Sequence, residues 1–573
     1  MSSSSALLRV PKQWGIRNTL CKPSQFTSSR QVSTSVSIRI PASQVPAKRP
    51  MQVRLLSTTV EEVHLKPAAR LEELRRVGLT PYPRYQPPPI PLAPIRDLVA
   101  QYQDTTENGT KDLTKKFSIN ARIYSKRESS SKLIWFDLIQ DGHAIQAVFN
   151  RKSYSGSNEE FEIAAKNFNR GDFVQMSGHV GKTKTGQLSV FITDGFELLA
   201  PCLHPIPTRS GLKDPEKRFR NRHLDFLVNR EGLENLRKRS QVIKFIRHYL
   251  DSRQFLEVET PILSTQAGGA NAKPFVTHAN ALDMEMHMRV APELFLKQLV
   301  IGGADRVYEL GKQFRNEGID ADHNPEFTTC EFYQAYANLD SLFEMTEDML
   351  QEMAKGVTGS STVPYKISNE ETVNLSFKKP FRKINIMETL EEKLGTPLPD
   401  LDNEPIAELL KLCKDNKVFV SAPHTVPRIM DKLISTFIEP ECTQPTFLWG
   451  HPLIMSPLAK DIKLDSGRTV AGRFELFVAG KEIVNAYEEL NDPVQQKERF
   501  TKQQTDKENG DEEAQPMDQA FCTALEYGLP PTAGWGMGVD RVCQILTGSS
   551  HIRDVLAFPT MRALKPSPTV VKE

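Results

Sequence analysis

The chain has 573 residues, of which 25% are charged and 39% hydrophobic, a composition typical of a globular protein with two or three domains. No apolar run is long enough to span a bilayer, and the seven cysteines include no CxxC pair, which argues against a membrane anchor, a disulfide framework or a zinc site. The net charge of +2 is uneven: residues 1–60 carry nine basic side chains and no acid, and subtracting these nine leaves −7 for the rest. A polyanionic partner must therefore bind a local basic surface.

The N-terminal segment is rich in serine and arginine, free of acids, and poor in residues that could form a core. This composition predicts a mitochondrial transit peptide at residues 1–57, with Arg54-Leu55-Leu56-Ser57 as the processing site, and hence a location in the mitochondrial matrix. The alternatives are a plain disordered tail and a nuclear or nucleic-acid-binding basic tail, and the latter is disfavoured because the charges are dispersed. Residues 58–110 follow, with a short helix beginning at Leu71 and a proline-dense linker from Pro81 to Pro94.

Five short segments of alternating hydrophobicity come next, at residues 117–124, 133–138, 144–149, 173–180 and 188–192. Short strands separated by glycine turns predict a five-stranded oligonucleotide-binding (OB) barrel at residues 111–205. Trp135 could stack an unpaired base, and the Gln146 amide could read a base edge, with Arg122 on the first strand. Judged alone, Trp135 would more often be a core residue.

The larger remainder opens with an amphipathic helix, Leu233–Ser252, and a strand, Phe255–Pro261, that ends in proline. Two short motifs follow, Gly268-Gly269-Ala270 and Ala291-Pro292-Glu293. The glycines permit close approach of the backbone to a ligand. Considered singly, Glu293 would be a solvated surface group.

A hairpin at residues 311–336 carries the strongest local signal, because its polar loop joins two predicted strands. Arg315 could neutralise an inner phosphate, His323 could reach an outer one, and Phe327 could stack under a purine. The alternative is a charged hairpin exposed to water.

The C-terminal part supplies further candidates for phosphate and metal chemistry. Glu475 and Glu482 stand near the ends of adjacent predicted strands, where two carboxylates facing a triphosphate could hold Mg²⁺; surface ion pairs are the alternative. Residues 501–518 are highly polar and predict a solvated loop. Gly534–Val542 is a glycine-rich strand running into a helix that carries Arg541.

Three of these segments match a known family in order and spacing. FRNEG and HNPEF at residues 314–327, with CEFY at 330–333, resemble the second signature motif of class II aminoacyl-tRNA synthetases and are most similar to the lysyl-tRNA synthetases of subclass IIb. Phe255–Pro261 resembles the first motif, and Gly534–Val542 resembles the third. The resemblance runs from about Phe117 to the C-terminus, and the leader favours a mitochondrial type.

The resemblance implies an α+β fold. An N-terminal five-stranded OB-fold β-barrel would bind the anticodon. A class II synthetase catalytic domain would follow at residues 206–573, built on an antiparallel β-sheet flanked by helices, with an insertion at about 340–470. It also implies a homodimer with Pro261 at the dimer interface.

The implied activity is ATP-dependent conversion of lysine to lysyl-adenylate and transfer of the lysyl group to the 3′ end of tRNA(Lys). The resemblance assigns Arg315 and Arg541 as catalytic and places Mg²⁺ at Glu475 and Glu482. The implied ATP-binding residues are Arg315, Glu317, His323, Phe327 and Arg541. The implied lysine-binding residues are Gly269, Glu293, Glu331, Tyr333, Asn485 and Glu489. The implied anticodon-binding residues are Arg122, Trp135 and Gln146.

Two other functions remain open from the sequence. Aspartyl- and asparaginyl-tRNA synthetases share the architecture but need cationic or amide groups where Glu331 and Glu489 stand. A buried substrate ammonium, in contrast, requires carboxylate partners. A dimeric tRNA-binding relative without catalysis is disfavoured because Arg315 and Arg541 are both present, together with the two carboxylates of the predicted metal site.

Overall fold

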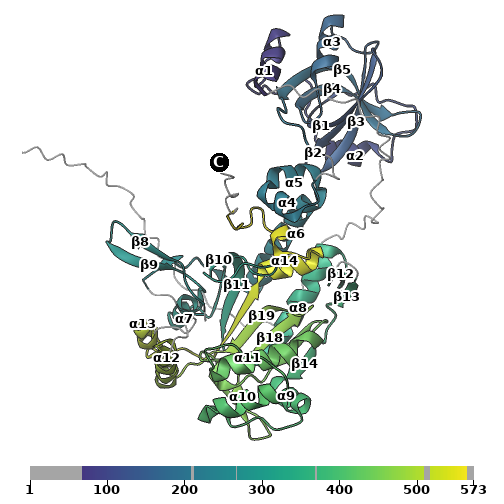
Figure 1. The fold of residues 1–573 in the computed structure, drawn as a ribbon. Helices are drawn as coiled ribbons and strands as arrows, with labels where there is room; N and C mark the ends of the chain where they lie inside the picture. Colours follow the sequence, from purple (N-terminus) through teal and green to yellow (C-terminus); the bar gives the residue numbers. More distant parts are fainter. Residues whose placement is uncertain are drawn as a thin grey trace, which may run out of the picture. The chain divides into compact units, whose positions relative to one another are not determined.

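The computed structural model describes residues 67–207, 212–265, 268–270, 272–367, 371–508 and 517–563, apart from the side chains of residues 402 and 505–508 (Figure 1). The predicted transit peptide, residues 1–57, lies outside the described residues. None of the helices in the described ranges is both long and apolar enough to cross a lipid bilayer.

The first folded part is a closed five-stranded barrel with strand order β1-β2-β3-β5-β4. Its strands are β1 Phe117–Ser130, β2 Leu133–Gln140, β3 His143–Asn150, β4 Phe173–Lys182 and β5 Leu188–Ala200. Each covers a predicted strand, so the predicted OB barrel is confirmed. The alternation of buried and exposed residues along each strand lets the closed barrel enclose a core. In β2, Ile134, Phe136 and Leu138 point into this core while the residues between them face outward.

Three helices accompany the barrel: α1 Pro67–Arg76, α2 Ile95–Tyr102 and α3 Asn158–Asn167. Helix α3 begins with a capping box in which Ser157 and Glu160 satisfy each other's backbone N–H groups. Helix α2 contributes Ile95, Leu98 and Tyr102 to the barrel core, although it precedes residue 111, where the sequence places the start of this domain.

The second part is built on an eight-stranded sheet of order β14-β15-β18-β19-β20-β11-β10-β6. Its strands are β6 Leu256–Glu257, β10 Arg306–Phe314, β11 Glu326–Ala335, β14 Arg382–Asn385, β15 Thr446–Trp449, β18 Arg473–Val478, β19 Lys481–Glu488 and β20 Thr532–Gly538. The predicted antiparallel sheet is confirmed for the central strands, whereas the outermost pairs, β14–β15 and β6–β10, are parallel. Strands β14 and β15 come from residues 340–470, so these parts of the predicted insertion are strands of the sheet itself.

The remaining elements surround this sheet. The helices are α4 Pro215–Arg220, α5 Arg222–Val228, α6 Arg230–Asp251, α7 Glu293–Ile301, α8 Leu339–Thr358, α9 Ile386–Leu394, α10 Ile406–Asp415, α11 Val426–Phe437, α12 Pro493–Glu508, α13 Gln519–Leu525 and α14 Val539–Thr547. The small sheets are β7 Leu263–Ser264 with β8 Val276–Ala279 and β9 Met284–Met288, β12 Thr362–Lys366 with β13 Thr372–Ser376, and β16 Asp461–Lys463 with β17 Thr469–Ala471.

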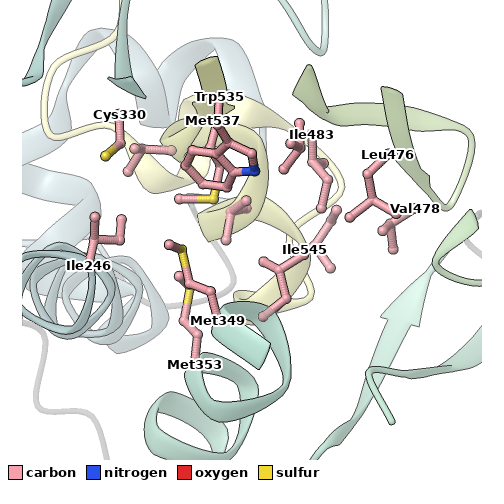
Figure 2. Close-up of a cluster of buried hydrophobic side chains, with 14 of the residues drawn as sticks. Ile246, Cys330, Met349, Met353, Leu476, Val478, Ile483, Trp535, Met537 and Ile545 are labelled. Carbon is pink, nitrogen blue, oxygen red and sulfur yellow. The ribbon is translucent and has the colours of Figure 1, made fainter. Parts of the chain in front are cut away.

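One face of the large sheet forms the main hydrophobic core, covered by helices α6, α8 and α14 (Figure 2). Alternate residues of β11 and β20 enter it, for example Phe332 of β11 and Trp535 of β20. The two rings stack with centroids 4.9 Å apart, and Trp535 Nε1 donates a hydrogen bond to Thr346 Oγ1 over 2.9 Å. The alternate residues of the same strands face the opposite side.

Two predicted segments differ in the structure. The predicted strand Phe255–Pro261 shortens to β6, because Thr260 donates its backbone N–H and hydroxyl to Glu309 over 3.2 Å and 2.6 Å instead of continuing the ladder. The predicted loop at 501–518 is wrong for residues 501–508, which belong to α12. That helix buries Phe500, so its polar composition reflects a solvated helical face.

Candidate active site

The face of the sheet opposite the core carries the predicted site residues, and the glycines of β20 make this arrangement possible. Gly534 lies between Tyr333 of β11 and Tyr487 of β19, and Gly536 lies between Glu331 and Asn485. A Cβ atom at residue 534 would be 2.0 Å from Glu489 Oε1 and 2.5 Å from Tyr333 Cε1. The absence of a side chain at residue 534 therefore leaves room for both Glu489 and Tyr333 over the strand.

A buried ion-pair cluster lies beside these strands. Lys297 of α7 is 0% exposed, and its Nζ lies 2.7 Å from Glu293 Oε1 and also pairs with Oε2 of Glu489, which is 1% exposed. The other oxygen, Glu489 Oε1, has no hydrogen-bond partner among the described residues. Burial raises the pKa of Glu489 to about 8, although Lys297 opposes this shift. This carboxylate has spare capacity for a cation.

The neighbouring groups have the same electrostatic character. Burial, followed by the charge of Glu293, raises the pKa of Glu331 to about 8. Burial and the charges of Glu293, Glu489 and Glu331 raise the pKa of Tyr333 well above its usual value, so the phenol stays neutral and can donate a hydrogen bond.

The two remaining members of the predicted lysine site also converge on this region. Gly269 has φ +90°, and a Cβ there would be 3.2 Å from Glu293 Cβ, so a side chain would be both strained and crowded. Asn485 Oδ1 accepts a hydrogen bond from Arg473 Nε over 3.1 Å, which fixes the amide beside Gly536. The structure therefore brings the six predicted lysine-binding residues to one side of the sheet.

The predicted ATP-binding residues gather at the β10–β11 loop and the start of α14. The Arg315 guanidinium carbon lies 5.1 Å from the Phe327 ring centroid. His323 Nε2 lies 3.0 Å from Arg541 Nη2, and His323 Nδ1 lies 2.9 Å from Asp320, which indicates that Nδ1 donates and Nε2 accepts. Glu317 is exposed in the same loop and forms no ion pair with any described residue.

The two predicted metal ligands lie on neighbouring strands, with Glu475 on β18 and Glu482 on β19. Burial alone would raise the pKa of Glu475, but Arg473 and His451 outweigh it and lower the pKa to about 2. Burial and the charge of Glu475 raise the pKa of Glu482. A cation between them would favour the ionised form of Glu482, and carboxylate oxygens suit Mg²⁺.

These two carboxylates are not a complete metal cage. Within the described ranges, no group of three or more His, Cys, Asp or Glu side chains is placed to hold a metal ion. Phosphate oxygens of ATP would have to supply further ligands, as the sequence predicts. The residues fit a metal that arrives with its nucleotide.

Three residues of this region were missed by the sequence reasoning. Lys297 stands four residues after Glu293 in a mostly apolar helix, a spacing that puts both on one helical face. Tyr487 and Arg473 each lie two residues from a predicted site residue in a strand, Asn485 and Glu475, and so share its face. The four-residue spacing in the helix and the two-residue spacing in the strands could therefore have identified these residues from the sequence.

The barrel presents a separate candidate surface on the outer face of β1, β2 and β3. Trp135 is half-buried, lies opposite Arg127 in the register, and donates from Nε1 to Ser129 Oγ over 2.9 Å. Gln146 is directly opposite Asp137, one diagonal step from Trp135. Arg122 lies opposite Ile139, four positions further along β2, or ~13 Å at strand spacing.

This spacing divides the predicted anticodon residues. Trp135 and Gln146 can contact the same or adjacent bases. Arg122 instead stacks on Phe173, with its guanidinium carbon 4.1 Å from the ring centroid. Arg127, which the sequence reasoning missed, is the cation nearest to Trp135 in the strand register.

Pro261, the predicted dimer residue, is exposed and stands among exposed aliphatic side chains. These are Leu256 (57% exposed), Ile262 (44%), Leu263 (44%) and Val276 (54%). Exposed aliphatic side chains, when they gather on one face, are typical of a surface that another protein chain covers.

Comparison with known proteins agrees with this geometry. Residues 214–562, more than half of the chain, match the family described as tRNA synthetases class II (D, K and N). Residues 117–199 match the family described as OB-fold nucleic acid binding domain. Together with the sheet and its charged face, these matches define a class II tRNA synthetase.

Comparison with individual proteins indicates which members of this class the chain is similar to. The chain is 50% identical over 449 residues to a protein of Encephalitozoon cuniculi named probable lysine–tRNA ligase, cytoplasmic, covering 77% of this chain and 86% of the relative. It is 44% identical to lysine–tRNA ligase cla4 of Cladosporium cladosporioides (82% and 79% covered) and 40% identical to a lysine–tRNA ligase of Enterococcus faecalis (86% and 96%). The chain belongs to the lysine–tRNA ligase family of class II synthetases.

Replacing Gly534 with alanine tests the glycine-dependent geometry. The added Cβ would displace Glu489 and Tyr333, and a displacement of about 1 Å in a site typically costs ~100-fold in rate. We expect kcat/KM for the amino acid to fall by roughly that factor in ATP–pyrophosphate exchange. Gly356→Ala in α8 is the matched control, since its nearest contact would be an ordinary 3.7 Å. Equal activity of both variants would contradict this role for Gly534.

Replacing Trp135 with alanine tests the barrel surface. Loss of one stacked base should weaken tRNA aminoacylation by about 1–3 kcal/mol, or roughly 5- to 150-fold. ATP–pyrophosphate exchange should be unchanged, because that chemistry lies in the other domain, and Trp135→Phe should retain most of the charging activity. A parallel loss of exchange would show that Trp135 supports the fold instead.

Proposed function

We propose that this protein activates lysine with ATP and transfers the lysyl group to tRNA(Lys) in mitochondrial translation. The observation that carries the proposal is the group of three acidic side chains at the charged face, Glu293, Glu331 and Glu489, of which Glu293 and Glu489 pair with the buried Lys297. The carboxylates outnumber that lysine, and Glu489 Oε1 lacks a hydrogen-bond partner among the described residues. A substrate with two ammonium groups would supply the cations that favour the ionised form of these acids.

In the first step, a carboxylate oxygen of lysine forms a bond to the α-phosphorus of ATP, and the bond to pyrophosphate breaks. A carboxylate is already nucleophilic at neutral pH, so catalysis consists of positioning and charge neutralisation. Arg315 would stabilise the charge that develops on the α-phosphoryl group, with Phe327 stacked on adenine. His323 and Arg541, whose side chains are 3.0 Å apart, would hold the outer phosphates.

Magnesium bound at Glu475 and Glu482 would neutralise phosphate charge. In the second step, the 3′-hydroxyl of the terminal tRNA ribose attacks the carbonyl carbon of lysyl-adenylate. AMP leaves, and the lysyl ester of tRNA forms. Trp135 and Gln146 would select the tRNA through its anticodon bases.

Selectivity for lysine over aspartate or asparagine follows from charge. A substrate carboxylate beside Glu331 and Glu489 would be repelled in a low-dielectric site. An amide side chain would leave Glu489 Oε1 without a counter-charge. The ε-ammonium of lysine is not repelled by Glu331 and Glu489, and it supplies the counter-charge for Glu489 Oε1.

ATP–pyrophosphate exchange measured with each of the twenty amino acids tests the proposal. Exchange should be strong with lysine and weak with aspartate and asparagine. Preference for either of the latter would replace the proposed substrate, and exchange with none would support a relative without catalysis.

Replacing Glu489 with glutamine keeps the shape of the side chain but removes its charge. Loss of a buried charge partner costs ~2–5 kcal/mol, so kcat/KM for lysine should decrease by a factor between roughly 30 and several thousand. Because the pKa of Glu489 is raised to about 8, wild-type kcat/KM should increase with pH through this value as the carboxylate ionises. Exchange kinetics at varied lysine and pH measure both effects.

The adjacent Glu488→Gln is the matched control, since Glu488 Oε1 accepts only the Leu339 backbone N–H over 2.8 Å among the described residues. Its lysine kinetics should equal those of the wild type. Normal lysine activation by Glu489→Gln would remove Glu489 from the substrate site.

The mitochondrial location rests on the nine basic and no acidic side chains of residues 1–60. N-terminal sequencing of protein purified from the matrix should begin near residue 58. An intact Met1 end in the matrix would contradict cleavage, and absence from the organelle would contradict the location.

The proposed homodimer rests on the exposed aliphatic side chains around Pro261. Sedimentation equilibrium should give twice the mass of the chain. Leu263→Asp should shift the protein toward monomer, while Leu113→Asp, at a more exposed leucine of the described chain (69% against 44%), should not. A monomeric wild-type protein would rule out the dimer.

A further inference from the structure

Lys297 is a fully buried cation whose place is unexplained by packing alone. It is 0% exposed, near the middle of helix α7, and its described ion-pair partners are Glu293 and Glu489. The Phe521 ring centroid lies 5.7 Å from Nζ. Burial of an ammonium is costly, and a hydrophobic side chain of similar volume would avoid that cost.

Both partners belong to the proposed lysine site, yet they come from elements far apart in the sequence. Glu293 stands at the start of α7, and Glu489 follows β19. Lys297 contacts Oε1 of Glu293 and Oε2 of Glu489, so a single ammonium fixes the distance between the two groups. Glu489 is thereby held with Oε1 over Gly534, among the residues that face the substrate.

We propose that Lys297 is a positioning residue that sets the separation between the carboxylates for the two ammonium groups of the substrate. This inference rests on the proposed function and deepens it. Glu293 binds the α-ammonium and Glu489 Oε1 binds the ε-ammonium. Lys297 acts through these two carboxylates and contacts neither ammonium group of the substrate. The site thus selects an α-amino acid whose side-chain ammonium is at a defined distance, which distinguishes lysine from the shorter ornithine.

The charge of Lys297 has a second effect on Glu489. The titratable groups around this carboxylate are Lys297 and Glu293 from α7 and Tyr333 from β11. Among them only Lys297 lowers the pKa of Glu489, against burial and the charge of Glu293. Its removal should therefore raise that pKa further and leave Glu489 protonated over more of the neutral range.

Lys297→Met, an unbranched neutral replacement, tests the proposal in ATP–pyrophosphate exchange. We expect KM for lysine to increase ~100-fold, as for a broken buried ion pair, with kcat and the KM for ATP changed less than about threefold. The ratio of kcat/KM for lysine over ornithine should fall about tenfold or more, since one methylene is worth ~10- to 200-fold in a fitted site. The pH profile for lysine should move to higher pH.

Lys355→Met is the matched control, because Lys355 forms an exposed pair with Glu352, 2.8 Å away on α8. Its lysine kinetics should be those of the wild type. Wild-type exchange with lysine tests the proposed function independently, so its failure is distinguishable from a failure of Lys297→Met alone.

The double variant Lys297→Met with Glu489→Gln keeps the test decisive if the single variant folds poorly, since it removes both charges of the pair. Because Lys297 acts in part through Glu489, Lys297→Met should cost about tenfold less in kcat/KM for lysine when Glu489 is already glutamine than it costs in the wild type. Full additivity would overturn the proposal. An unchanged lysine KM, ornithine ratio and pH profile in a folded Lys297→Met protein would also overturn it.

Discussion

The alternation of side chains between the two faces of the central strands is the constraint on which the structure depends. In β11 and β20, one set of residues builds the apolar core under α6, α8 and α14, while the other set consists of residues such as Glu331 and Tyr333 on β11 and of glycines on β20. A shift of the register by one residue would place Glu331 in the core and Phe332 in the site. Packing of Trp535 on Phe332 therefore fixes the strands and, through them, the charged face. Packing of the core thus determines which side chains face the candidate site, because the same strands contribute residues to both.

The charged face is also organised by how buried charges are paired. Lys297 forms ion pairs with Glu293 and Glu489. Arg473 forms an ion pair with Glu475 and donates a hydrogen bond to Asn485. Each resident cation compensates part of the negative charge and leaves a remainder: Glu489 Oε1 lacks a hydrogen-bond partner in the described chain, and the pKa of Glu482 is raised. Such remainders are costly in a protein interior unless a ligand completes them. The substrate ammonium groups and a metal with its nucleotide are the complements that this arrangement requires.

Local sequence patterns were sufficient wherever the interactions are local. The five barrel strands, the β10–β11 hairpin and helix α6 were predicted because alternation, helical spacing and turn residues act within a few positions. They failed at β6, where the distant Glu309 accepts hydrogen bonds from Thr260 and the strand ends. They also failed at α12, which buries Phe500 and continues into a segment whose composition suggests a loop. Parallel pairing at the sheet edges, β6–β10 and β14–β15, was likewise invisible because it joins strands separated by long connections.

The sequence by itself determined the family, the two-part fold and most of the residue types in the site, because three motifs with fixed spacing carry them. It could not determine which charges meet. Lys297 pairs with Glu489 across 192 positions of sequence, and Trp135 is grouped with Arg127 instead of Arg122 only by strand register. Ion pairing depends on distances of a few ångströms in a low-dielectric interior, and such distances between remote segments are set by tertiary packing alone.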